Sequence, residues 1–281
     1  MKRCDLHTHS NCSDGSLSPR ELVLAAKECG LSAVALTDHN TVAGLREFLD
    51  TGKQEGIETV AGCEFTTAYN GTELHLVGLF LPPDAWAAID VPLQKQREEK
   101  HRNNDLLLER LRANGYAITR AEVEALTHSE EFNRNPVAHV LVSKGYVAST
   151  QEAFDTLLSE SVGFYVPGKR PDTLSVIRFL KPFGVVTVLA HPFLNMDAQT
   201  LCDFLPHAVD AGLDAMETHY TDFDAQKTAE AQRIAAHFGL LESGGSDFHG
   251  TRKAHVLLGT GKGSLCVPYD FYEKLAARAG G

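Results

Sequence analysis

Two short apolar segments in the first 40 residues are each followed by histidine and aspartate. The stretch reads KRCDLHTHSNCSDGSLSPRELVLAAKECGLSAVALTDHN and covers residues 2–40. KRCDL and LSAVALT are typical of strands, and the second resembles a strand buried on both faces. Between them, the sequence predicts a helix with Ser18 as N-cap, Glu21 completing a capping box, and Gly30 after its end. This order of elements indicates a parallel βαβ unit.

The alternation of strands and helices continues along most of the chain. Helices are expected at about 42–55 and at 269–279. Further strands are predicted at 57–65, 73–81, 185–191, 213–218, 240–247 and 255–259. Roughly 200 residues of such alternation favour an α/β barrel, with an open doubly wound sheet as the alternative. We expect functional groups at the carboxyl ends of the strands in either fold.

The middle of the chain has a different pattern. From 83 to 163 the sequence predicts consecutive helices, including the charged stretch QKQREEKHRNNDLLLERLRANG at 94–115. We therefore expect a discontinuous barrel domain at 1–82 and 164–281. The segment 83–163 would be a helical insertion with its own small core.

Composition limits the possible partners. The chain of 281 residues has 37 acidic and 26 basic residues, a formal net charge of -11, and 43% hydrophobic residues. A broad basic face for duplex DNA is therefore not expected, although bound cations could attract a small anion. The sequence predicts a cytoplasmic protein without a membrane span. Its six cysteines lack a CxxC pair and are expected to be reduced. No obligate protein partner is evident.

Histidines and carboxylates follow nearly every predicted strand. A single buried histidine is usually a hydrogen-bonded core residue, but so many polar groups at one rim would be costly to desolvate without cations. His7 and His9 are two residues apart in an extended segment, so both side chains can reach one ion. The residues at the predicted rim are His7, His9, Asp14, Asp38, His39, Glu64, His75, His191, Glu217, His219, Asp247 and His249.

Mixed imidazole and carboxylate ligands suit Mn, Zn or Fe. A structural metal site needs only four ligands, which is fewer than the sequence offers. A serine hydrolase is disfavoured because no GxSxG motif is present. A non-catalytic, metal-dependent interaction or regulatory protein remains an alternative from another class.

Six short motifs resemble the PHP (polymerase and histidinol phosphatase) family of metal-dependent phosphoesterases. They are DLHTHSNCSDGS (5–16), LTDHNTVAG (36–44), GCEFT (62–66), ELHLVG (73–78), AHP (190–192) and GGSDFHG (244–250). The resemblance implies a distorted, TIM-like (β/α)7 barrel that binds two to three divalent ions and hydrolyses phosphate esters. It implies one ion bound by His7, His9, Glu64 and Asp247, a second bound by Glu64, His75 and His191, and a third bound by Asp14, His39 and His249.

The same resemblance implies further roles. Glu64, Asp247 and His191 would hold the ions that carry the attacking hydroxide. Asp38 would orient a ligand from outside the coordination sphere.

The helical segment suggests a branch of this family. NRNPVAHVLVSKGYVASTQEAF (133–154) and YVPGKRPDTLSVI (165–177) resemble enzymes that remove the 3′-phosphate of nucleoside 3′,5′-bisphosphates or trim short RNA from its 5′ end. The resemblance implies that the insertion 83–163 covers the substrate and that Arg134, with Arg102 and Asn103, binds substrate phosphate. The basic side chains of the charged stretch could instead be a solvated helix face. The motif ETHYTDF (217–223) departs from this branch, and a histidinol-phosphate-like phosphatase of small metabolites is the alternative.

Overall fold

The computed structural model describes the chain except residues 1, 128–131, 133, 160, 162, 167, 280 and 281. The chain folds as two compact units, one formed by Met1–Pro92 with Arg170–Gly281 and the other by Leu93–Lys169. These boundaries differ from the expected insertion at 83–163. The helical unit extends beyond 163 because Phe164 and Tyr165 pack on its core and the backbone N–H of Lys169 donates to Glu99 Oε1 over 3.1 Å.

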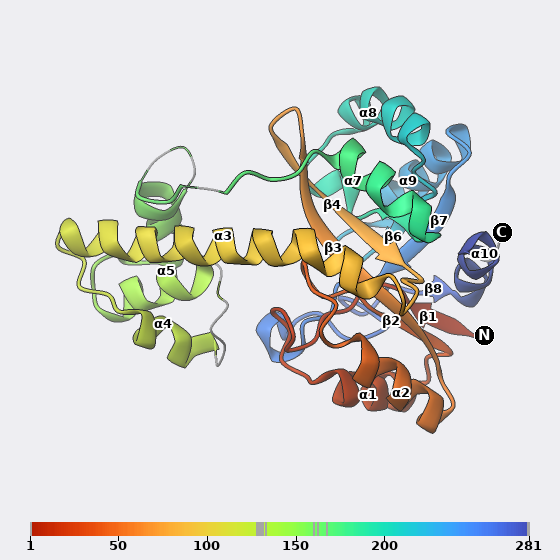
Figure 1. Cartoon of the computed structure of the whole chain (residues 1–281), viewed down its shortest axis with the longest axis horizontal. Helices are drawn as coiled ribbons and strands as arrows, with labels where there is room; N and C mark the ends of the chain where they lie inside the picture. The colour runs from red at the N-terminus through yellow and green to blue at the C-terminus, as the bar shows by residue number, and fades with distance from the viewer. Residues whose placement is uncertain are drawn as a thin grey trace. The chain divides into compact units, whose positions relative to one another are not determined.

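The first unit is a nearly closed barrel (Figure 1). Its strands are β1 (Arg3–Asp5), β2 (Ala33–Leu36), β3 (Glu58–Tyr69), β4 (Thr72–Leu79), β5 (Val186–Leu189), β6 (Ala215–Tyr220), β7 (Leu241–Gly245) and β8 (Val267–Pro268), in the spatial order β7-β6-β5-β4-β3-β2-β1-β8. The backbone N–H of Leu6 donates to the carbonyl of Gly244 over 3.1 Å. This bond brings the chain after β1 against β7 and curls the sheet into the predicted barrel.

Strand β4 runs antiparallel to both of its neighbours, whereas β1-β2-β3 and β5-β6-β7 pair in parallel. The register of the β3–β4 hairpin places His75 opposite Thr66. His75 lies near the start of its strand, yet the reversed direction brings it to the rim where the parallel strands end. The hairpin therefore lets an early residue of β4 join the side chains that follow the other strands.

The strand predicted at 255–259 is wrong. The segment forms turns, with Leu257 bridging to Gly261. Gly259 and Gly261 have φ angles of 71° and 55°, which turn the chain back on itself. Asp5 fixes this turn, since its Oδ2 accepts a hydrogen bond from the backbone N–H of Gly259 over 2.8 Å.

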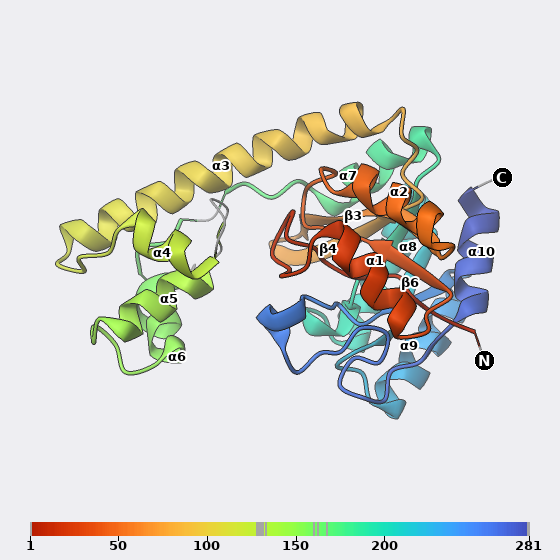
Figure 2. The same ribbon diagram turned by 90° about the horizontal axis from the view of Figure 1, so that it is seen from below.

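Helices cover the outside of the barrel (Figure 2). They are α1 (Pro19–Glu28), α2 (Leu45–Glu55), α7 (Thr173–Leu180), α8 (Ala198–Ala211), α9 (Ala225–His237) and α10 (Tyr269–Ala279). The predicted capping box of α1 is confirmed, because the side chain of Ser18 accepts from Glu21 N and that of Glu21 accepts from Ser18 N. Phe271 and Leu275 of α10 pack into an apolar core with Leu6, Val60 and Val188. This buried core holds the strands in place, and the strands in turn position the residues at the rim of the barrel.

The second unit is helical. It contains the larger part of α3 (Trp86–Ala113), then α4 (Arg120–Thr127), α5 (Arg134–Ser143), α6 (Thr150–Ala153) and a π-helical turn, η1 (Phe154–Leu158). Leu107, Leu111, Val137 and Leu141 belong to its buried core. In the described part of the chain, no helix has the length and apolar character needed to cross a membrane.

Candidate metal centre

The nine predicted ligands all lie in the barrel unit. Two of them lie within strands, Glu64 in β3 and His75 in β4. The others follow the ends of β1, β2, β5 and β7, and they are His7, His9, Asp14, His39, His191, Asp247 and His249. His191 and Asp247 adopt φ angles of 28° and 55°, which non-glycine residues rarely adopt. Such backbone conformations are found most often at functional sites, where the surrounding structure holds them in place.

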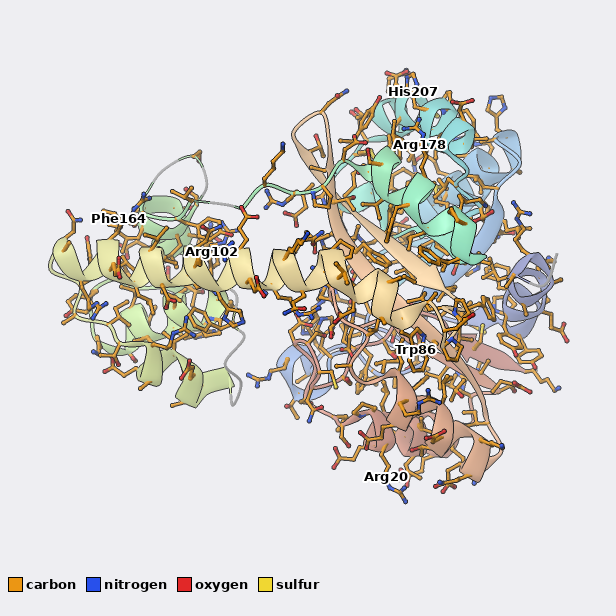
Figure 3. All side chains as sticks on the ribbon, viewed as in Figure 1. Arg20, Trp86, Arg102, Phe164, Arg178 and His207 are labelled. Atoms are coloured by element: carbon orange, nitrogen blue, oxygen red, sulfur yellow. The ribbon has the colours of Figure 1, made fainter. Side chains whose placement is uncertain are left out.

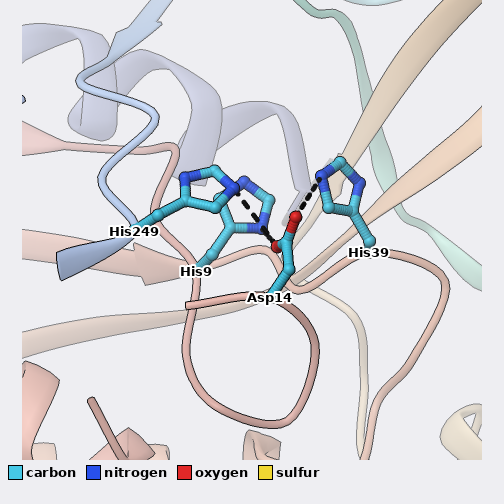
Figure 4. A group of neighbouring side chains, drawn as sticks. All are labelled: His9, Asp14, His39 and His249. Carbon is cyan, nitrogen blue, oxygen red and sulfur yellow. Dashed lines mark ion pairs between the residues drawn. The ribbon is translucent and has the colours of Figure 1, made fainter. Parts of the chain in front are cut away.

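These side chains form three overlapping groups whose potential ligand atoms lie within 4.8 Å of one another. The groups are His7, His9, Glu64 and Asp247; His9, Asp14, His39 and His249; and His39, Glu64 and His75. Figure 4 shows the second, with Asp14 between His39 and the pair His9 and His249. The first group has the same members as the set implied for the first ion. The structure also adds His9 beside Asp14, and it groups His39 rather than the expected His191 with Glu64 and His75. The assignment of ligands to individual ions stays a prediction.

Glu64 lies at the centre of the cluster and is 1% exposed. Its Oε1 lies 2.7 Å from His75 Nδ1 and 3.0 Å from His191 Nε2. Its Oε2 lies 3.1 Å from both His7 Nε2 and His39 Nδ1. The two carboxylate oxygens therefore face different imidazoles, which is the arrangement expected of a carboxylate that bridges two ions.

The cluster also contains polar atoms that lack hydrogen-bond partners. Within the described residues, the buried side-chain atoms without such a partner are His7 Nε2, both ring nitrogens of His9, His39 Nδ1, Glu64 Oε2 and Thr221 Oγ1. The imidazole nitrogens and Glu64 Oε2 do lie in ion-pair contact, as His7 Nε2 does with Glu64 Oε2 at 3.1 Å, but without a hydrogen bond. Burying a polar atom without a hydrogen bond costs about 1–3 kcal/mol. All but Thr221 Oγ1 belong to the cluster, and imidazole nitrogens with carboxylate oxygens are typical ligands of divalent transition metals. These residues therefore fit a divalent cation.

The charges of the cluster are strongly coupled. Burial alone lowers the pKa of His75 and His9, but neighbouring carboxylates, Glu64 among them, outweigh it and raise these pKa values to about 10 and about 9. For His39 burial dominates and lowers the pKa to about 3. Surrounding imidazoles hold the pKa of Glu64 well below its usual value despite its burial. Without a cation, protons on imidazoles therefore balance the carboxylates.

Glu217 supports two expected ligands, a role that sequence reasoning did not assign. Its Oε1 lies 2.8 Å from His7 Nδ1, and its Oε2 accepts from the backbone N–H of His191 over 2.7 Å. The pairing of β6 with β7 shifts between Glu217 and His219. His219 instead packs edge-on against Phe271, with ring centroids 5.1 Å apart. The position of Glu217 at a strand end was the available signal, but the register shift cannot be read from the sequence.

Asp38 acts on the cluster less directly than expected. Its Oδ1 accepts from the backbone N–H of Ser10 over 2.8 Å, and its Oδ2 accepts from Ser10 Oγ over 2.6 Å. Ser13 Oγ donates to it as well, over 2.5 Å. These bonds hold the loop that carries Asp14, rather than the imidazole of a ligand.

The residues expected to bind substrate phosphate lie in the helical unit. Arg134 donates to the carbonyl of Leu158 over 3.0 Å, and its guanidinium carbon lies 4.2 Å from the ring centroid of Tyr165. Arg102 is exposed on α3 (Figure 3), and its neighbour Asn103 is half-buried. Contact between these residues and substrate stays a prediction.

A cavity of about 390 Å³ opens beside the cluster. His39, Glu64, His75, His191 and Asp247 line one part of it. The rest of the cavity wall comes from the last residue of β6 and from the loops after β5, β6 and β7. These residues are Leu194, Asn195, Tyr220, Thr221, Asp222, Lys253, His255 and Val256. A small substrate could therefore reach the cluster within the barrel unit itself.

A barrel with potential metal ligands converging beside a cavity at its rim is typical of metal-dependent hydrolases. The PHP domain family model matches residues 5–159. The chain therefore belongs to the PHP domain family, and it is a metal-dependent hydrolase of phosphate esters.

Three curated relatives align with most of the chain. A 5'-3' exoribonuclease of Haemophilus influenzae is 31% identical over 249 residues, covering 88% of this chain and 90% of that protein. A phosphoribosyl 1,2-cyclic phosphate 1,2-diphosphodiesterase of Eggerthella lenta is 29% identical, with coverages of 90% and 97%. A 3',5'-nucleoside bisphosphate phosphatase of Chromobacterium violaceum is 28% identical, with coverages of 89% and 88%.

A crystal structure described as a candidate metal-dependent phosphoesterase from Bifidobacterium adolescentis shares the fold. Its TM-score is 0.82 at 28% identity, and the match covers 99% of this chain and 96% of that one. The predicted barrel fold is thus confirmed. The non-catalytic alternative is not supported.

Proposed function

We propose that this protein hydrolyses a phosphate ester of a ribonucleotide, either the 3′-phosphate monoester of a nucleoside 3′,5′-bisphosphate or the phosphodiester bond at the 5′ end of short RNA. The observation that carries the proposal is the buried cluster of imidazoles and carboxylates around Glu64, part of which lines a cavity large enough for a phosphate ester. The cavity is too small for a long duplex.

The side chains have distinct roles in this proposal. The three overlapping groups of side chains would hold two or three divalent ions, with Mn, Zn or Fe suited to these ligands. Bound cations would supply a water nucleophile at neutral pH and neutralise charge on the phosphoryl oxygens. Glu217 keeps His7 and His191 in place, and Asp38 keeps the loop of Asp14 in place. The protein thereby presents the ligands in one geometry before substrate arrives.

The names of the relatives support a substrate built on ribose. One is named for RNA, one for a nucleoside bisphosphate and one for a phosphoribosyl cyclic phosphate. A phosphate ester on a ribose is common to all three. The phosphatase and exoribonuclease names agree with the branch that the helical segment resembles, so we favour these substrates over a histidinol-phosphate-like metabolite.

The test compares kcat/KM of the Mn-loaded protein for four compounds. They are adenosine 3′,5′-bisphosphate, 3′-AMP, histidinol phosphate and a phosphoribosyl 1,2-cyclic phosphate. A second phosphate that gains one charge-assisted contact should raise kcat/KM about tenfold to a hundredfold over 3′-AMP. A preference for histidinol phosphate or for the cyclic diester would overturn the proposed substrate while leaving the phosphoesterase activity intact.

A further inference from the structure

The cavity contains one fixed positive charge beside the cluster. Of the described residues that line it, Lys253 alone is a lysine or an arginine. Lys253 ends the short helix η4 (Gly250–Lys253), which directly follows His249. Its side chain is 39% exposed, and its Nζ lies 2.8 Å from Asp247 Oδ2. The ammonium is therefore accessible from the cavity while remaining next to an expected ligand.

Asp247 uses its two oxygens for different partners. Its Oδ1 faces the cluster, 3.2 Å from His9 Nε2. Its Oδ2 accepts hydrogen bonds from Tyr220 Oη over 2.9 Å and from Lys253 Nζ over 2.8 Å. Tyr220 is buried and already holds this oxygen, so a second donor is not required for orientation. The ammonium of Lys253 has three N–H donors, and its hydrogen bond to Asp247 uses one of them.

We propose that Lys253 binds a non-bridging oxygen of the phosphoryl group that is hydrolysed, which rests on the proposed phosphoesterase function. The phosphoryl group must lie beside the cluster to react. Lys253 is next to that position, because its Nζ contacts Asp247, a member of the cluster. A phosphate dianion entering a protein of net charge -11 needs local positive charge, and an ammonium in a partly enclosed cavity provides it. Lys253 belongs to the barrel unit, so this contact does not depend on the helical unit.

This role differs from the one expected of Arg134. A residue that contacts the hydrolysed phosphate should matter equally for every substrate, since all of them carry that group. A residue that contacts a second phosphate should matter only for substrates that have one. The two roles therefore predict different patterns of loss across the same pair of substrates.

The test uses Lys253→Met, which keeps most of the side-chain length without the charge, and Lys253→Arg, which keeps the charge. In the Mn-loaded protein, calorimetry measures the Kd of inorganic phosphate, and emission spectrometry measures bound Mn. We expect Lys253→Met to raise the phosphate Kd about tenfold to a hundredfold with unchanged Mn content, and Lys253→Arg to restore part of the affinity. The variant should also reduce kcat/KM for adenosine 3′,5′-bisphosphate and 3′-AMP by similar factors.

Tyr220→Phe is the matched control, because it removes the other donor to Asp247 Oδ2 without changing the charge of the cavity. It should change Mn affinity more than phosphate affinity. If Lys253→Met loses Mn as Tyr220→Phe does, or binds phosphate as tightly as wild type, the proposal is overturned. A wild-type protein that neither binds phosphate nor hydrolyses any ester would overturn the proposed function as well, so the two failures are distinguishable.

Discussion

Glu217 and His7 form a buried pair in which the carboxylate fixes the direction of the imidazole. Glu217 Oε1 lies 2.8 Å from His7 Nδ1, and on the other side of the ring His7 Nε2 lies 3.1 Å from Glu64 Oε2. Glu217 can therefore hold a proton on Nδ1, which would leave Nε2, directed at the centre of the cluster, to bind a cation. Carboxylates that orient a ligand histidine in this way also raise its basicity.

Glu217→Gln should weaken metal binding about tenfold to a hundredfold, because it removes the charge that supports the ligand His7. A competition titration with a chromogenic chelator measures the Kd of Mn or Zn. Glu242→Gln is a suitable control, since Glu242 accepts from Thr218 and Gln232 and is not part of the cluster. Equal Kd values for Glu217→Gln and wild type would contradict the support role.

His191→Ala should reduce phosphatase activity by at least about a hundredfold with a modest loss of stability, because it removes one ligand but little apolar packing. Turnover, metal content and Tm are measured on the same sample. His219→Ala provides the same substitution at a histidine that packs against Phe271 outside the cluster. We expect full metal content in this control, and a matching loss of metal in both variants would contradict the assignment of His191.

Removal of metal by a chelator should abolish activity and leave most of the helical circular dichroism. The barrel core around Leu6, Val60 and Phe271 is apolar and needs no cation to pack. Adding Mn back should restore turnover. Cooperative unfolding on chelation would show instead that the cations hold the fold together.

Metal binding should release protons and should weaken as the pH falls. The pKa values of His75 and His9, about 10 and about 9 without a cation, mean that both imidazoles carry protons at pH 7. A cation must displace these protons to reach the nitrogens, so acid competes with metal. Calorimetry in buffers of different ionisation enthalpy should give a net proton release at pH 7. Binding with no proton exchange would argue against these ligands.

Arg134→Ala should reduce kcat/KM for adenosine 3′,5′-bisphosphate about tenfold to a hundredfold and affect 3′-AMP far less. The substitution also removes a hydrogen bond to the Leu158 carbonyl and the contact with Tyr165, so Tm must be compared with wild type. Arg102→Ala, at an exposed position of α3, tests the second candidate in the same assay. Equal losses on both substrates would reject a contact between Arg134 and a second phosphate.

The sequence predicted the features of the site that depend on local pattern. Short-range pattern was enough to predict the capping box of Ser18 and Glu21 and the polar residues after the strands. It also predicted that the side chains of His7 and His9 point to the same side of the chain. The apolar run at 255–259 was mistaken for a strand because its glycine turn depends on the distant Asp5.

Other features of the site depend on contacts between residues far apart in the chain. The role of Glu217 depends on a register shift and on its contacts with the distant residues His7 and His191. Local pattern carries no information on such contacts.

The antiparallel strand β4 has a consequence for synthesis of the chain on the ribosome. Its partner β5 begins at Val186, after the helical unit Leu93–Lys169. The edge of β4 that pairs with β5 therefore has no partner strand until the helical unit has been synthesised. During this interval the nascent chain holds His7, His9 and Glu64 but lacks Asp247 and His249. An ion captured then would have an incomplete set of ligands and could dissociate again. The complete set of expected ligands therefore exists only after nearly the whole polypeptide has been translated.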